Sequence, residues 1–109
     1  MAVASSANDE LHPLVGIDQV IHAPARLMVM TCLYVVESAD FIFLMNLTSL
    51  TWGNLSTHLS KLEEAGYVEV IKEFVNKKSH TMIRLTKEGR AAFQEYRKNM
   101  MDVLGNLPD

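Results

Sequence analysis

The sequence has a single cysteine and no long apolar run, and both shortages limit what the chain can be. Cys32 stands alone among 109 residues, so an internal disulfide is excluded, which fits a reducing compartment. No apolar stretch reaches the roughly 18 residues that a membrane span needs. The first ten residues, MAVASSANDE, have neither the basic segment nor the apolar segment of a secretion signal. We therefore expect a cytoplasmic protein that does not cross a membrane.

The motifs of common catalytic and metal sites are also lacking. The sequence has no glycine-rich phosphate loop, no G-x-S-x-G elbow and no H-E-x-x-H. Its four histidines show no i, i+4 pair and no cysteine cluster nearby, so they do not indicate a metal site. Glu63 and Glu64 are adjacent, and on a helix they point about 100° apart, so they cannot face one substrate. We expect no enzyme activity, no cofactor and no metal.

Charge is modest overall and unevenly distributed. The formal net charge is -3, which taken alone argues against binding to nucleic acid. Residues 1–50 contain one basic residue, Arg26, against five acidic ones, whereas residues 76–90 contain five basic residues against one acid, Glu88. The five are Lys77, Lys78, Arg84, Lys87 and Arg90. A local basic patch can bind phosphates even when the whole chain is slightly acidic.

The remaining composition is that of one folded domain. Hydrophobic residues make up 49% of the chain and charged residues 21%, which indicates a folded protein. A chain of 109 residues is long enough for one domain with one core. The sequence shows no internal repeat and no low-complexity block. We expect residues 1–12 to be a flexible tail and residues 13–105 to form the domain.

Two helices are predicted in the first half of the domain. Residues 11–24 are broken by proline and glycine, which leaves room for one short helical turn at most. Apolar residues at helical spacing indicate a helix over residues 25–36, and Pro24 suits its first position because proline has no backbone donor to lose. The stretch FIFLMNL predicts a second helix, for which Ser38 or Asp40 can supply the N-cap oxygen.

The stretch TWGNLSTHLSKLEEAG predicts a third helix over residues 51–65 with two contrasting faces. Thr51 is expected to cap it, and Gly66 supplies the left-handed stop. The inner stripe is Leu55, Leu59 and Leu62, and the outer face is Gly53, Thr57, Ser60 and Lys61. Surface helices usually carry many charged side chains, so an outer face of short hydroxyl residues indicates contact with a partner.

After Gly66 the hydrophobic period changes. The stretches YVEVIKEFV and HTMIRL are rich in β-branched and aromatic residues and flank the polar link NKKS, which predicts a two-stranded hairpin with a basic tip. Thr86 then suits the N-cap of a last helix over residues 87–104. Three helices, a basic hairpin and a fourth helix describe a winged helix-turn-helix, a fold that is mainly α with a small β-hairpin (α+β). In that fold the second helix of the motif lies in the major groove of DNA.

The segments PARLMVMTCL, LTWGNLSTHLSKLEEAGYVEV and TKEGRAAFQEY resemble those of small winged-helix transcriptional regulators of the MarR and ArsR types. The resemblance covers residues 16–104, and it implies a cytoplasmic homodimer that binds operator DNA through the third helix and the wing. Carried over by position, the groove-facing residues are Thr51, Asn54, Ser56, Thr57, Ser60 and Lys61, and the wing-tip residues are Lys77 and Lys78. Two features depart from the pattern: the link NKKS has no arginine for the minor groove, and the paired cysteines of ArsR metal sites are missing.

Several residues have simpler interpretations than a functional one. The angular position of Trp52 places it on the core side of the third helix, which favours packing over base stacking. His58 flanks the leucine stripe and is interpreted as a packed or phosphate-facing side chain. Cys32 is expected to be a small buried hydrophobe, because a thiol sensor would need a low pKa and exposure.

The last helix carries an apolar stripe that is longer than a small core can cover. The stripe consists of Phe93, Tyr96, Met100 and Val103, with Leu104 beside it. It extends about 16 Å at 1.5 Å per residue, so its far end would be exposed, and exposed apolar patches usually mark an interface. We predict that this stripe forms a homodimer interface; the alternative is that the helix frays after Lys98.

The sequence as a whole predicts a regulator that binds specific double-stranded DNA, with the helix of residues 51–65 in the major groove and the basic wing of residues 75–80 on the backbone or minor groove. The alternative is a winged-helix module that binds protein, which the net charge and Glu64 favour. A third possibility, small-ligand sensing at the dimer interface, could coexist with DNA binding, and the sequence identifies no effector.

Overall fold

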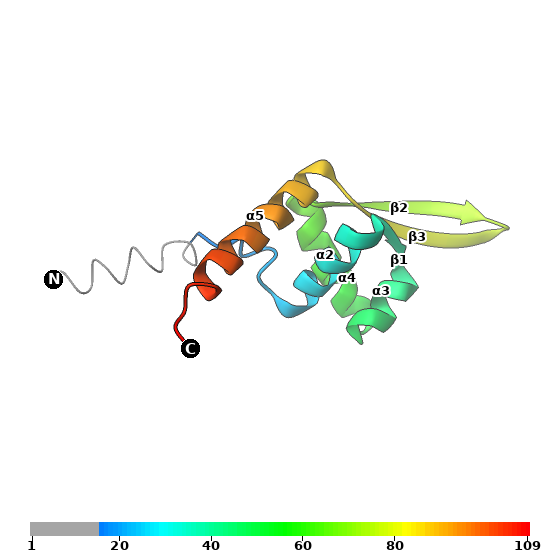
Figure 1. The fold of residues 1–109 in the computed structure, drawn as a ribbon. Helices are drawn as coiled ribbons and strands as arrows, with labels where there is room; N and C mark the ends of the chain where they lie inside the picture. The colour runs from blue at the N-terminus through cyan, green and yellow to red at the C-terminus, as the bar shows by residue number, and fades with distance from the viewer. Residues whose placement is uncertain (1–15) are drawn as a thin grey trace.

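The computed structural model describes residues 16–109, so the predicted tail of residues 1–12 lies outside the described residues. The elements in chain order are α2 (Pro24–Val36), β1 (Ser38–Asp40), α3 (Phe41–Thr48), α4 (Trp52–Glu64), β2 (Val68–Val75), β3 (Lys78–Leu85) and α5 (Lys87–Leu104). The helices gather at one side of the sheet's base, and the β2–β3 hairpin projects away from them (Figure 1). This arrangement confirms the predicted winged helix.

In the described part of the chain, α3, α4 and α5 begin at a side-chain cap, whereas α2 follows Ala23 and begins with Pro24. Asp40 rather than Ser38 caps α3, because its carboxylate accepts from the Phe43 amide at 2.8 Å. Thr51 accepts from the Asn54 amide at 3.3 Å and starts α4 as predicted. Gly66 follows α4 with a φ of 80°, a left-handed conformation that costs glycine little.

The sheet has one strand more than the sequence indicated. β1 pairs antiparallel with β3, and the strand order is β1-β3-β2. Ala39 lies opposite Ile83, and both side chains are buried. A strand of three residues is too short to show a period of two, so only its partner in the fold reveals it.

The hairpin tip is tighter than the predicted link of residues 76–79. Only Asn76 and Lys77 lie outside the strands, and both have positive φ, 51° and 64°. This is the backbone of a two-residue turn that matches the twist of the flanking strands. Lys78 therefore belongs to β3, where it pairs with Val75.

One apolar core joins all the helices to the sheet. Its fully buried members come from four elements and the segment before α2. They are Ile21, Val29, Met30, Leu33, Leu44, Leu55, Leu62 and Ile83. The segment before α2 contributes more than the predicted short turn, because Ile17 and Ile21 are both buried and Asp18 accepts from the amides of Val20 and Ile21.

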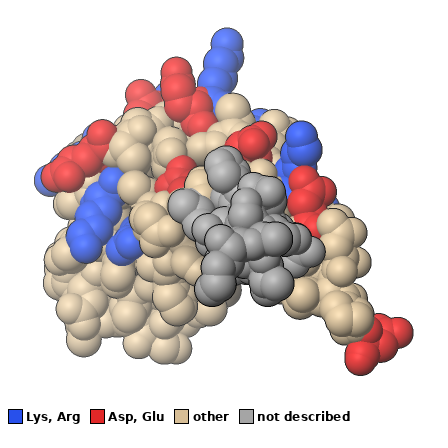
Figure 2. All heavy atoms as spheres, turned by 90° about the vertical axis from the view of Figure 1, so that its left-hand side faces the viewer, with Lys and Arg blue, Asp and Glu red and all other residues tan. Residues whose placement is uncertain are grey.

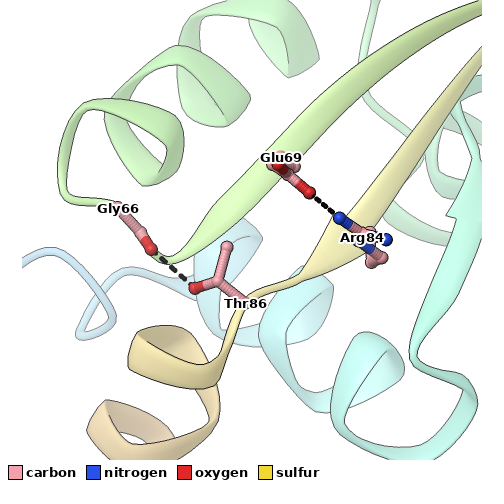
Figure 3. Close-up of polar contacts among 4 residues, drawn as sticks. All are labelled: Gly66, Glu69, Arg84 and Thr86. Atoms are coloured by element: carbon pink, nitrogen blue, oxygen red, sulfur yellow. Dashed lines mark hydrogen bonds and ion pairs between the residues drawn. The ribbon is translucent and has the colours of Figure 1, made fainter.

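Thr86 joins the base of the hairpin to α5. Its hydroxyl donates to the Gly66 carbonyl at 2.6 Å and accepts from the Gly89 amide at 2.9 Å, as the predicted cap of α5 should. Close to this contact, Arg84 on β3 forms an ion pair with Glu69 on β2 (Figure 3). These contacts hold the hairpin in one position relative to the ends of α4 and α5.

We expect Gly89→Ala to destabilise the protein. A Cβ at Gly89 would lie 2.1 Å from the Tyr67 carbonyl oxygen and 2.9 Å from Leu85 Cδ1. The Tyr67 carbonyl belongs to the link before β2 and accepts from the Thr86 amide, and Leu85 is buried; neither can give way cheaply, so the free energy of unfolding should fall by about 2–3 kcal/mol. Urea denaturation followed by circular dichroism measures this loss.

The matched control is Gly53→Ala. No atom lies within 4 Å of the Cβ that would be added at Gly53, so removing a glycine from an exposed helix should raise the free energy of unfolding by about 0.5–1 kcal/mol. Equal effects of the two substitutions would contradict the close packing of α5 against the hairpin base.

Candidate nucleic-acid interface

The buried leucine stripe of α4 determines which side chains of this helix face outward. Leu55, Leu59 and Leu62 are buried as predicted. The side chains predicted to face a groove of DNA lie opposite this stripe or beside it. Thr51, Asn54, Thr57, Ser60 and Lys61 are exposed, and Ser56 is half-buried at the edge of the helix.

Two of these hydroxyl groups are already engaged with the backbone of α4. Thr51 caps the helix, and the Thr57 hydroxyl donates to the Gly53 carbonyl at 3.0 Å. Thr57 therefore presents its methyl group and its oxygen lone pairs outward, rather than a free donor. A methyl group suits contact with thymine, and Asn54 beside it can donate and accept at a base edge.

The basic cluster predicted from the sequence divides into two parts in the fold. Arg84 is paired with Glu69, and the guanidinium of Arg90 lies 4.7 Å from the centre of the Tyr34 ring and 3.7 Å from the Glu37 carboxylate. Both arginines are thus occupied near the base of the hairpin. Lys77 and Lys78 remain exposed at the tip of the hairpin.

Trp52 corrects the sequence interpretation. Its side chain is 58% exposed, because the first residue of α4 lies beyond the edge of the core. Its indole packs on the ring of Phe41, with centroids 4.2 Å apart. Trp52 borders a groove between α4 and the hairpin, and Lys72 borders the same groove. Lys72 is not among the candidate site residues predicted from the sequence. Lys72 lies outside the 76–90 charge cluster, and only the pairing of β2 with β3 brings it to this groove.

Arg26 ties the start of α2 to the middle of α4. Its guanidinium donates to the carbonyls of Gln19 and Val20 and lies 3.0 Å from Nδ1 of His58. Burial, with the nearby charges of Arg26 and Lys61, lowers the pKa of the His58 imidazole. A neutral His58 can accept from Arg26, so this histidine is a packed residue that helps to position α4, one of the two roles interpreted from the sequence.

The apolar stripe of α5 is partly used within the chain. Phe93 and Tyr96 are buried, and Tyr96 Oη lies 2.9 Å from His22 Nδ1. They therefore offer little surface to a partner, although the sequence interpretation placed them in an interface. Met100 and Val103 are half-buried, and the exposed part continues through Met101, Leu104 and Leu107.

A second apolar surface lies on the outer face of α2. Cys32 is half-buried there rather than fully buried, and burial raises the pKa of its thiol. A raised pKa lowers the fraction of Cys32 that is present as the reactive thiolate. Met28, Val35 and Val36 are exposed on the same helix, with Leu47 of α3 beside them. In the view of Figure 2, acidic and basic side chains mix along the top and at both sides, and an uncharged area lies at the lower left.

Within residues 16–109, no helix is long and apolar enough to cross a membrane, and no group of histidine, cysteine and acidic side chains is placed to hold a metal ion.

Comparison with known proteins places this geometry in context. The family model for a winged helix DNA-binding domain matches residues 25–104. The uncharacterized protein MJ0432 of Methanocaldococcus jannaschii is 34% identical over 89 residues, which are 82% of this chain and 97% of that protein. The solved transcriptional regulator homologue from Pyrococcus horikoshii OT3 has a TM-score of 0.81 and 25% identity, and the match covers 91% of this chain and 99% of that one.

A further solved structure shares the fold alone. Reduced AbfR bound to DNA, a protein of Staphylococcus epidermidis, has a TM-score of 0.63 at 20% identity, over 94% of this chain and 68% of that one. The predicted resemblance to small winged-helix transcriptional regulators is confirmed by these comparisons.

The contact between Arg26 and His58 predicts a pH-dependent stability. The pKa of His58 is lower in the folded chain than the ordinary 6.5, so the unfolded chain takes up a proton first as the pH falls. The stability from this contact is therefore fully present above pH 6.5 and is lost as the pH drops through the folded-state pKa. We expect His58→Gln to lower the free energy of unfolding by about 1 kcal/mol at neutral pH.

Urea denaturation of both proteins across the acid range measures this effect. The gap between wild type and His58→Gln should narrow as the pH falls. A gap of constant size would show that the contact does not depend on the protonation of His58.

Proposed function

The chain belongs to the winged helix DNA-binding domain family, and on this premise we propose that it is a transcriptional regulator that binds a specific double-stranded DNA site. The observation that carries the proposal is the outer face of α4. It is exposed, short-chained and rich in hydroxyl and amide groups, while the leucine stripe opposite is buried. Such a regulator works beside the chromosome, so the proposal places it in the cytoplasm.

In the proposed complex, α4 enters the major groove with its first turns nearest the bases. Asn54 and Thr57 would meet base edges, and Ser60 and Lys61 the flanking backbone. Thr51 and Ser56 would lie at the margins of this contact. Direct readout through an amide and a threonine methyl distinguishes base pairs in the major groove, where each pair has its own pattern of donors, acceptors and methyl groups.

The wing would supply charge rather than base recognition. Lys77 and Lys78 lie at the exposed tip of a hairpin that projects from the body of the protein (Figure 1). A lysine ammonium is a compact charge suited to phosphate, whereas the flat guanidinium of arginine is the better reader of a narrow minor groove. We therefore assign the wing tip to the phosphate backbone.

The proposal includes a homodimer formed through the end of α5. Met101 is 63% exposed and Leu104 is 55% exposed, with Met100 and Val103 half-buried beside them. Packing the same stripe from two chains about a two-fold axis would cover these side chains. It would also present two copies of α4 to successive turns of the duplex, about 34 Å apart.

A protein-binding module is the second candidate, and it has an observation in its favour. Exposed aromatic side chains are found around the hairpin and α3: Phe43, Trp52 and Phe74 are 53%, 58% and 75% exposed. Aromatic residues of this kind are enriched at protein interfaces. The net charge of -3 also fits a protein partner better than a polyanion.

Selection of bound duplexes from a random-sequence pool separates the two candidates. A regulator should enrich one sequence, and a dimer should return two related half-sites about 34 Å apart. A pool that shows no enrichment after repeated rounds at low salt would refute sequence-specific DNA binding.

Replacing both Lys77 and Lys78 by alanine should weaken DNA binding chiefly through charge. Each neutralised phosphate contributes about 0.9 to the slope of log K against log salt, so the double variant should lose up to ~2 from that slope. Fluorescence anisotropy of a labelled duplex over a salt series measures it.

The control for the wing variant removes two charges elsewhere. Arg97 and Lys98 are exposed on α5, and replacing both by alanine should leave the slope unchanged. If the two double variants alter the slope equally, the wing tip has no special contact with DNA.

The intact chain should sediment as a dimer at micromolar concentration, and Met100→Glu combined with Leu104→Glu should give a monomer. Two carboxylates within an apolar interface lose hydration without gaining partners. The matched control adds the same negative charge outside the stripe, through Ala91→Glu and Lys98→Gln, and should remain dimeric. A monomeric wild type would overturn the interface assigned to α5.

A further inference from the structure

A groove separates α4 from the hairpin; it shares Ser60 with the outer face of α4 and does not include Lys77 or Lys78 of the wing tip. It consists of two adjoining hollows of about 540 and 420 Å³. Trp52, Phe41, Lys72 and Thr81 border both hollows. The first is also lined by Ser56, Leu59, Ser60 and Glu63 of α4 and by Val70 of β2, and the second by Asp40, Ile42, Ser79 and His80.

The inference rests on the proposed function, which is DNA binding. On that premise, the position of the groove indicates that DNA would occupy it. If α4 lies in the major groove and the hairpin tip reaches the neighbouring backbone or minor groove, one sugar–phosphate strand must pass between α4 and the hairpin. We propose that Trp52 and Lys72 hold that strand, with a deoxyribose against the indole and a phosphate on the ammonium group.

Trp52 is suited to a sugar because it is both exposed and held in place. Its ring is supported from one side by Phe41, with centroids 4.2 Å apart, and it is 58% exposed. An indole presents an apolar face to the sugar and a ring N–H that can donate to a phosphate oxygen. Because the support is an aromatic ring at the edge of the core, Trp52 loses little further freedom when a ligand covers it.

Lys72 is suited to a phosphate because of the face of the hairpin on which it lies. It pairs with Thr81 across the strands, and Phe74 pairs with Ser79 two residues further along the same face. The lysine and these hydroxyl groups all offer donors to phosphate oxygens.

The acidic groups of the groove leave this contact open. The Asp40 carboxylate accepts from the Phe43 amide as the cap of α3. Glu63 borders the first hollow together with Lys72, about 16 Å along α4 from Trp52 at 1.5 Å per residue, and the two side chains form no ion pair within residues 16–109. A protein segment is the other occupant to test, but the lysine and the hydroxyl groups that border the groove beside its apolar residues offer donors to phosphate oxygens, and an apolar peptide would leave these donors unused.

Trp52 is the only tryptophan of the chain, so its fluorescence reports the groove directly. The wild-type protein is titrated with a mixed-sequence duplex at low salt, or with a duplex recovered by selection. Binding is followed independently by the anisotropy of a fluorescein label on the DNA. We expect the bound duplex to shield Trp52 from quenching by acrylamide at least about twofold, since burial of the exposed ring blocks collisions with the quencher.

The variants test the affinity that each contact supplies. Trp52→Ala should weaken binding about tenfold, which corresponds to about 1.4 kcal/mol, while Trp52→Phe should retain most of the affinity. Lys72→Gln should lower the salt slope by about 0.9. The controls are Phe43→Ala, an exposed aromatic residue outside the groove, and Lys98→Gln on α5; neither should change affinity or slope.

The contact of Trp52 and Lys72 with the DNA strand is called the clamp. The outcomes of the experiment test this clamp separately from the function on which it rests. If the labelled duplex does not bind the wild type, the proposed function fails and the clamp fails with it. If the duplex binds while Trp52 stays open to acrylamide, the clamp is overturned, the function stands and the groove is left to a protein segment. Should Trp52→Ala fail to fold, quenching in the wild type and the slope of Lys72→Gln still decide the matter.

Discussion

The burial of three leucines on α4 is the constraint on which the rest of the surface depends. Leu55, Leu59 and Leu62 lie in the core, and each contributes roughly 1.5–3 kcal/mol by leaving water. Turning the helix by one residue, about 100°, would bury hydroxyl groups and expose leucine. The helix therefore has one acceptable rotation, and the outward direction of Asn54, Thr57 and Lys61 follows from it.

A second set of contacts fixes the hairpin relative to that helix. The link between α4 and β2 is only three residues long, and the Thr86 hydroxyl bonds to the Gly66 carbonyl within it (Figure 3). Gly89 lets α5 approach the same link so closely that a Cβ would meet the Tyr67 carbonyl. Together with the contact between Arg26 and His58 of α4, these interactions connect α4 to α2, to the hairpin base and to α5.

Local pairing decides which charges are available to a partner. The chain is slightly acidic overall, and two of its basic residues near the hairpin base, Arg84 and Arg90, lie beside Glu69 and Glu37. The lysines of the hairpin, Lys77 and Lys78 at its tip and Lys72 beside α4, form no ion pair within residues 16–109. Electrostatic attraction to a phosphate backbone would therefore be concentrated at the wing rather than spread over the whole surface.

Much of this protein can be read from neighbouring residues, because caps, turns and helical periods act over a few positions. Asp40, Thr51 and Thr86 begin helices, Gly66 ends one, and the change from helical spacing to β-branched stretches locates the hairpin. The leucine stripe of α4 also follows from spacing alone. These signals were sufficient for the winged helix and for the side chains that face outward from α4, whose roles in DNA binding stay predictions.

Only the tertiary structure decided the features that depend on contacts between residues far apart in the sequence. β1 exists because β3 completes its hydrogen bonds, and Tyr96 is buried because residues before α2 fold back over α5. Trp52 is exposed because the core ends beneath it, and Lys72 joins it because two strands pair. Periodicity records which face of an element is apolar, but the extent of the core that covers this face is set by the packing of distant segments.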